Sequence, residues 1–216
     1  MNASSERFIV VVLDRAVQNT QLEGPQGEKS MALFDLHTID TAPEAARPLL
    51  EESAKAFGRI PNLHAVMAES PEHLEAYKNL HALFERSDLS KVERNVVWLT
   101  INVENACHYC VPAHTAIAMM QGVDEATINA LRAGDALDDP KLEALRQFTL
   151  AIVRQRGVLD TQQVSTFLEA GYARRHVLDV LIGVAQKTLS NYVNHIADTP
   201  VDPAFARFAW VNPVAG

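Results

Sequence analysis

The sequence predicts a single all-α domain, and three observations support this class. Helix-start signals recur along the chain. In each of them a capping residue precedes a proline or stands three residues before a glutamate. These signals are Thr41 to Glu44, Ser70-Pro71, Ser90 to Glu93 and Asp139-Pro140. Between them the apolar residues recur three and four apart, as on one face of a helix. Residues 41 to 197 show no alternating pattern typical of a strand.

The predicted helices follow one another in the order of these signals. We expect them over residues 43–57, 62–69, 71–87, 91–105, 109–121, 124–133, 140–156, 161–170 and 174–197. Pro48 falls inside the first of them, so that helix should start later or bend there. Glycine stops four helices, at Gly58, Gly122, Gly134 and Gly171.

The last helix carries the longest apolar pattern of the chain. Its members are Leu178, Leu181, Ile182, Ala185, Leu189, Tyr192, Val193 and Ile196. Such a wide apolar arc is not expected on a helix half exposed to water. We therefore expect this helix to be central, or to be covered in a contact between subunits.

The two ends of the chain differ in composition from its middle. Residues 1–30 contain one short apolar run, Val10 to Leu13, followed by a polar stretch with glycine and proline. We expect these residues to form a loosely attached arm, or to reflect an upstream start codon, and residues 31–216 to form the helical domain. Beyond the last helix, we expect Phe205, Phe208 and Trp210 to pack back on the body or on a neighbouring subunit.

Charge and hydropathy exclude several classes of partner. The net charge of -8 argues against nucleic-acid binding, which requires clustered Lys and Arg. No apolar run approaches the roughly 18 to 20 residues that span a bilayer, and the run at Phe8 to Leu13 is too short for a signal peptide. We therefore predict a cytoplasmic protein without a membrane partner. In that reducing compartment, a lone pair of cysteines three residues apart is catalytic or metal-binding more often than structural.

The two cysteines, Cys107 and Cys110, stand where a helix should begin. Pro112 is tolerated only in the first turn of a helix, which places that start within residues 109 to 112. Unpaired N–H groups and the helix dipole favour a thiolate there. His114 follows Cys110 by four residues and so shares its helix face, and Glu104 precedes Cys107 by three. This pattern predicts a thiol pair with a protonated His114 stabilising the Cys110 thiolate, and with Glu104 orienting or relaying, without a metal.

Two other interpretations of these residues stay open. Cys107, Cys110 and His114 could be structural thiols beside a core histidine, or could bind zinc together with His108. The zinc site is disfavoured because four ligands on one turn cannot easily surround one ion. Among the other histidines, we expect three at the surface or boundary and one, His195, either capping carbonyls or lining the site. The three are His64, His73 and His81.

The segment Asn102 to His114, followed by Gly122, resembles the core motif of the AhpD-like alkylhydroperoxidases of the carboxymuconolactone decarboxylase superfamily. Two further segments are similar to the peroxidase-related branch: Arg59 to Leu63, and Asn194 to Ala197 with Asp202. The resemblance covers about residues 38 to 210 and leaves the N-terminal arm outside.

The resemblance implies an all-α fold, assembly into homo-oligomers such as trimers or hexamers, and reduction of hydroperoxides by an external dithiol without haem or flavin. By motif match Cys110 would attack the peroxide, Cys107 would resolve the product, and His114 would belong to the proton relay. The usual relay glutamate falls at Asn95 here, so Glu104 is inferred to replace it, and Tyr109 stands where the best-known members carry a histidine. A non-catalytic thiol redox sensor and a lactone decarboxylase are the alternatives.

Overall fold

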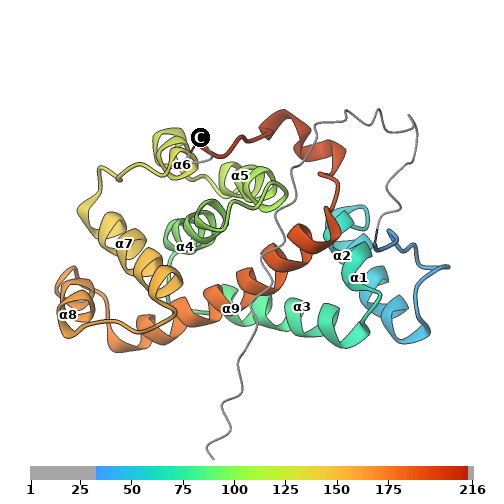
Figure 1. The fold of residues 1–216 in the computed structure, drawn as a ribbon, viewed down its shortest axis with the longest axis horizontal. Helices are drawn as coiled ribbons and strands as arrows, with labels where there is room; N and C mark the ends of the chain where they lie inside the picture. The colour runs from blue at the N-terminus through green and yellow to red at the C-terminus, as the bar shows by residue number, and fades with distance from the viewer. Residues whose placement is uncertain (1–32, 214–216) are drawn as a thin grey trace, which may run out of the picture. The chain divides into compact units, whose positions relative to one another are not determined.

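A computed structural model describes residues 33–213, and in this range the chain is built from helices without strands (Figure 1). The helices are α1 (Arg47–Phe57), α2 (Asn62–Met67), α3 (Pro71–Glu85), α4 (Lys91–Glu104), α5 (Cys110–Met120), α6 (Glu125–Ala133), α7 (Pro140–Gln155), α8 (Thr161–Glu169) and α9 (Arg174–Ala197), with 3-10 turns η1 (Glu44–Ala46) and η2 (Pro203–Phe208). The predicted all-α class is confirmed, and each predicted helix is present. The predicted arm, residues 1–30, lies outside the described residues.

Local signals explain where the helices start and stop. The first helix begins at Arg47 rather than at residue 43, because Pro48 is accommodated in its first turn. Ser90 and Glu93 cap α4 reciprocally: the Ser90 N–H donates to the Glu93 carboxylate at 2.7 Å, and the Glu93 N–H donates to Ser90 Oγ at 3.2 Å. Gly58 ends α1 at a φ of 70°, a left-handed conformation that glycine adopts without strain.

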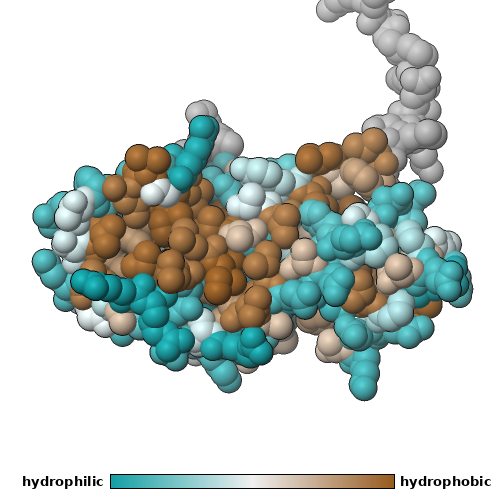
Figure 2. Space-filling view, turned by 90° about the horizontal axis from the view of Figure 1, so that it is seen from below, coloured by the Kyte–Doolittle hydropathy of each residue, from teal (hydrophilic) through white to brown (hydrophobic). Residues whose placement is uncertain are grey.

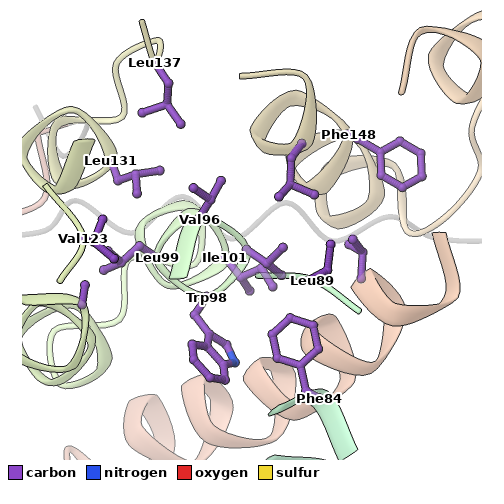
Figure 3. Close-up of a cluster of buried hydrophobic side chains, with 14 of the residues drawn as sticks. Phe84, Leu89, Val96, Trp98, Leu99, Ile101, Val123, Leu131, Leu137 and Phe148 are labelled. Atoms are coloured by element: carbon purple, nitrogen blue, oxygen red, sulfur yellow. The ribbon is translucent and has the colours of Figure 1, made fainter. Parts of the chain in front are cut away.

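The centre of the fold is α4, which is buried on nearly all sides. It lies between α5, α6, α7 and α9 in Figure 1. In the close-up of Figure 3, Val96, Trp98, Leu99 and Ile101 leave this helix in different directions. All four are buried, with at most 1% of their surface exposed. Because its apolar side chains point in several directions, α4 is stable only inside the protein, and the other helices therefore surround it.

The long helix α9 is oriented with its polar side inward. It packs against α3 and α4, and its buried residues include Gln186, Lys187, Ser190, Asn191 and Asn194. Members of the predicted apolar stripe instead face outward: Leu178 is 64% exposed, Tyr192 57% and Ile196 65%. The helix itself is central, as one of the two expected alternatives has it, and Ile182 and Val193 pack against the core. The exposed part of the stripe is not covered within the chain, and its burial between subunits stays a prediction. Figure 2 shows a broad hydrophobic area on the side of the molecule where α8, α3 and the start of α9 lie.

Two expectations about single residues have different outcomes. His64 is buried, not at the surface, and its Nδ1 lies 2.8 Å from Ser53 Oγ. The C-terminal aromatic residues do pack back on the body: the Arg59 guanidinium lies 5.2 Å from the centre of the Phe205 ring, and the Trp210 indole N–H donates to a backbone carbonyl at 2.9 Å.

None of the described helices is long and apolar enough to cross a bilayer.

The close packing of α9 against α3 and α4 depends on a glycine. A Cβ atom at Gly183 would lie 3.0 Å from a ring carbon of Phe84 and 3.0 Å from a methyl group of Val97. We expect Gly183→Ala to destabilise the protein by about 1 to 3 kcal/mol through overpacking. Urea unfolding measures the change in the free energy of unfolding, and a decrease would confirm that the added Cβ atom is overpacked. Without the close contact, alanine in a helix interior would instead stabilise by about 1 kcal/mol.

Candidate active site

A left-handed turn joins α4 to α5 and places the first cysteine. Ala106 has a φ of 53°, and its N–H donates to the Val103 carbonyl at 2.9 Å. The next N–H, of Cys107, donates to the Asn102 carbonyl at 2.9 Å, which completes a Schellman motif with alanine in the position where glycine is usual. Helix α5 then begins at Cys110, within the predicted range, so one thiol lies before the helix and the other in its first turn.

Both thiols are buried and reduced, and α9 supplies a hydrogen bond to each. Cys107 is 0% exposed and Cys110 1%. The Cys110 N–H donates to Cys107 Sγ at 3.3 Å. Asn194 Nδ2 donates to Cys110 Sγ at 3.2 Å and, more weakly, to Cys107 Sγ at 3.8 Å. The Ser190 hydroxyl oxygen lies 3.8 Å from Cys110 Sγ. The two sulfurs are thus held between the start of α5 and the polar face of α9.

The buried imidazole of His114 contacts a buried lysine. Lys187 Nζ lies 2.9 Å from His114 Nε2, and Lys187 is only 1% exposed. An ammonium is a donor only, so Nε2 accepts, and the proton of a neutral His114 ring is on Nδ1. The ring also lies 5.1 Å from the ring of Trp98, whose indole N–H donates to Gln186 Oε1 at 2.7 Å.

The two thiols have opposite acidities. Burial by itself would raise the pKa of Cys110, but a hydrogen bond from Cys107, the charge of Lys187 and a hydrogen bond from Ser190 outweigh it and lower this pKa to about 5. The hydrogen bond to Cys110, burial and the charge of Cys110 raise the pKa of Cys107 well above its usual value. At neutral pH Cys110 is therefore the thiolate and Cys107 the protonated thiol that donates to it.

The histidine does not carry the positive charge that the sequence predicted. Burial, the charge of Lys187 and the charge of His81 lower the pKa of His114 well below its usual value. The imidazole is therefore neutral at physiological pH, and the expectation of a protonated His114 is wrong, because burial and the adjacent Lys187 both disfavour a charged ring. Lys187 supplies the positive charge near Cys110.

The four residues considered for zinc do not converge on one point. His114 Nε2 faces the Lys187 ammonium, and His108 Nε2 lies 3.0 Å from the backbone carbonyl of Thr199. Within residues 33–213, no group of three or more His, Cys, Asp or Glu side chains is arranged to hold a metal ion.

Glu104 is engaged away from the thiols. Its two carboxylate oxygens accept from Arg154 Nε and Nη2, each at 2.8 Å. In the described part of the chain no hydrogen bond joins it to Cys107, Cys110 or His114. At the position where the resemblance led us to expect a relay glutamate, the buried Asn95 donates through Nδ2 to the Lys91 carbonyl at 2.8 Å and to Gln121 Oε1 at 2.7 Å. The predicted relay by Glu104 has no contact in the structure that supports it.

The residues between the two cysteines anchor the segment that follows α9. The Tyr109 hydroxyl donates to Asp202 Oδ2 at 2.5 Å and accepts from the Leu63 N–H at 3.2 Å. Arg59 Nε lies 3.5 Å from the same carboxylate group. The three segments that carry the family resemblance, around residues 59–63, 102–114 and 194–202, therefore meet at this site. His195 itself is exposed.

Sequence reasoning missed the polar residues of α9 that form one wall of the site. A signal was present: Gln186, Lys187, Ser190, Asn191 and Asn194 recur at helical spacing opposite the apolar stripe. This spacing alone does not say which of the two faces points inward. Only the position of α5 against α9 shows that the polar face is the buried one.

Fold and site together define a helical protein with a buried, polarised dithiol. Residues 71–151 match the model of the carboxymuconolactone decarboxylase family. This match confirms the predicted resemblance to the carboxymuconolactone decarboxylase superfamily over those residues. No protein of curated function matches the sequence significantly.

Several solved structures share the fold. An AhpD-core, peroxidase-related protein from Ralstonia eutropha JMP134 superposes with a TM-score of 0.71 at 21% identity, over 80% of this chain and 93% of that one. A peroxidase-related protein from Silicibacter sp. TM1040 gives 0.69 at 20% identity, over 84% and 96%. The debrominase Bmp8, a cysteine variant in complex with 2,3,4-tribromopyrrole, gives 0.69 at 15% identity, over 84% and 97%.

The opposite acidities predict an order of thiol modification. At pH 6 to 7, Cys110 should be alkylated by iodoacetamide before Cys107, because only the thiolate reacts. Burial slows both reactions to a similar extent, because Cys107 is 0% and Cys110 1% exposed. Peptide mass spectrometry after timed quenching measures the two rates separately. Faster labelling of Cys107 would reverse the assignment of the two sulfurs.

The alanine in the left-handed turn predicts a stabilising substitution. Ala106→Gly should raise the free energy of unfolding by about 1 kcal/mol, because a side chain at this φ is strained. The matched control is Ala130→Gly inside α6, which should lower it by about 1 kcal/mol. Urea unfolding followed by circular dichroism measures both. A loss of stability for Ala106→Gly would show that the turn is not strained.

Proposed function

We propose that this protein is a thiol-dependent hydroperoxide reductase that acts through Cys110 and Cys107. The observation that carries the proposal is the placement of two buried sulfurs side by side: the Cys110 N–H donates to Cys107 Sγ at 3.3 Å, and Asn194 Nδ2 donates to both sulfurs. Their surroundings lower the pKa of Cys110 and raise that of Cys107. A peroxidatic sulfur must be ionised to attack, and a resolving sulfur must be close enough to form a disulfide. The peroxidase-related names of the solved structures with the same fold point in the same direction.

The proposed cycle has three balanced steps. The Cys110 thiolate attacks the terminal oxygen of the hydroperoxide, so that an S–O bond forms, the O–O bond breaks, and the leaving oxygen takes a proton to become an alcohol. The Cys110 sulfenic acid then condenses with the Cys107 thiol, which releases water and forms the disulfide. An external dithiol reduces the disulfide and is itself oxidised. We assign to His114, the neutral imidazole at the site, the transfer of this proton to the leaving oxygen.

We further propose that the protein works as a homo-oligomer, such as a trimer or hexamer, in a reducing cytoplasm. The outward face of α9 supports this assembly, because Leu178, Leu181, Tyr192 and Ile196 are between 41% and 65% exposed. A single chain rarely leaves such a stripe in water, and a second copy of the same stripe is a complementary partner.

The main alternative is a redox sensor that forms the same disulfide once, without turnover. A lactone decarboxylase would need no thiol pair, and the hydrogen bonds that hold both sulfurs count against it. Because one solved structure with this fold binds 2,3,4-tribromopyrrole, a bromopyrrole is a useful second electron acceptor to test.

Peroxide turnover tests the proposal. With cumene hydroperoxide and excess dithiothreitol, the wild-type protein should consume peroxide catalytically, and Cys110→Ser should not. Cys107→Ser should react once and accumulate a sulfenic acid at Cys110 that dimedone labels. His114→Ala should slow the reaction about a hundredfold, within the range of a proton-transfer residue.

The possible outcomes of this assay separate the alternatives. One equivalent of oxidation without turnover would indicate the sensor. Turnover of the bromopyrrole and not of the peroxide would identify a dehalogenase, and a fully active Cys110→Ser protein would contradict the thiol mechanism.

The oligomer has its own test. Tyr192→Lys and Ile196→Lys should reduce the mass measured by light scattering, because each places a charge in the proposed contact. The matched control is Met120→Lys at the end of α5, which replaces a side chain that is 76% exposed and should leave the mass unchanged. A monomeric wild-type protein would contradict the proposal.

A further inference from the structure

Lys187 is a buried ammonium for which the described structure shows no carboxylate partner. It is 1% exposed and lies in the middle of α9. The ion pairs formed within residues 33–213 do not include it. Its hydrogen bond is to the neutral His114. A buried charge without an opposite charge is strongly destabilising, so a group near Lys187 is expected to be an anion.

The geometry places Lys187 beside Cys110. Lys187 Nζ lies 2.9 Å from Nε2 of His114, one turn along α5 from Cys110, and the hydroxyl oxygen of Ser190, one turn along α9 from Lys187, lies 3.8 Å from Cys110 Sγ. Five titratable groups interact with Lys187 from the elements around it. They are Tyr77 and His81 of α3, Cys107 before α5, and Cys110 and His114 of α5. Burial raises the pKa of Tyr77 and lowers that of His81, so both are neutral at pH 7, as are Cys107 and His114. Cys110 is the one group of this set that is ionised.

We propose that Lys187 is the positioning residue of this site: its ammonium is the counter-charge of the Cys110 thiolate and, by donating to His114 Nε2, it keeps the imidazole neutral with its proton on Nδ1. This inference deepens the proposed function, because it assigns the charge on which the attacking sulfur depends. The peroxide cycle itself rests on the two cysteines. The charge pairing of Lys187 with Cys110 can hold whether or not peroxide is the substrate.

The role of Lys187 follows from where the charge is needed. A neutral histidine cannot stabilise a thiolate by charge, and the hydrogen bond from Asn194 is made by a neutral donor at 3.2 Å. A single positive charge beside a buried sulfur acts more strongly than it would in water, because little solvent screens it. Arginine would keep the charge, whereas methionine has a similar volume and removes it.

The test is the pH dependence of Cys110 alkylation by iodoacetamide in full-length protein, followed by peptide mass spectrometry. The wild-type midpoint should lie near pH 5. Lys187→Met should raise it by about two units or more, and should slow alkylation at pH 6 by roughly tenfold or more, since one unit of pKa is a factor of ten in thiolate. Lys187→Arg should restore most of the shift. Lys141→Met on α7 is the matched control, since Lys141 pairs with Glu93 at 3.1 Å, and it should leave the midpoint unchanged.

A stability measurement covers the case in which a variant folds poorly. Lys187→Met should be less destabilising, or more stabilising, in a Cys110→Ser background than in the wild type, as measured by the change in the urea midpoint. The reason is that the ammonium has already lost its counter-charge when the thiolate is absent. Equal shifts in both backgrounds, or an unchanged alkylation midpoint in Lys187→Met, would overturn the inference. If the midpoint shifts as expected but the wild type does not turn over peroxide, the charge pairing stands and the proposed function fails.

Discussion

The inward polar face of α9 constrains most of the rest of the structure. A helix that buries an amide, a hydroxyl and an ammonium is stable only where partners meet each of these groups. The partners are the two sulfurs and the His114 ring at the start of α5, and the indole of Trp98 on α4. Helices α4 and α5 must therefore lie against this face of α9. The apolar stripe of α9 is left outward, which links the chemistry of the site to the proposed assembly.

Much of the fold could be predicted from the sequence, because its helix boundaries are encoded locally. Caps such as Ser90 with Glu93, prolines in first turns and glycine at Gly58 mark helix ends without reference to the rest of the chain. The start of α5 was predictable for the same reason, and with it the positions of Cys107 and Cys110. The orientation of α9 was not predictable, since an apolar stripe looks alike whether the core or a second subunit covers it.

The site was predictable only as far as its residues are close in sequence. Cys107, Cys110 and His114 come together because they lie on one turn and the helix that follows it. The charge that the chemistry requires comes from Lys187, 73 positions after His114, and no local pattern links the two. The assignment of a positive charge to His114 was wrong because burial and the neighbouring Lys187 lower the pKa of the imidazole well below its usual value. Glu104, close in sequence, pairs with Arg154 instead.

The central claim is that Cys110 is a thiolate at neutral pH inside the protein. The ultraviolet absorbance of thiolate, recorded against pH for the wild type and for Cys110→Ser, tests this most directly. The difference between the two curves should show one transition near pH 5, and no second thiol should ionise at neutral pH. A transition at the ordinary cysteine pKa of about 8.5 would contradict the account, because the charges around the sulfur would then have no effect on it.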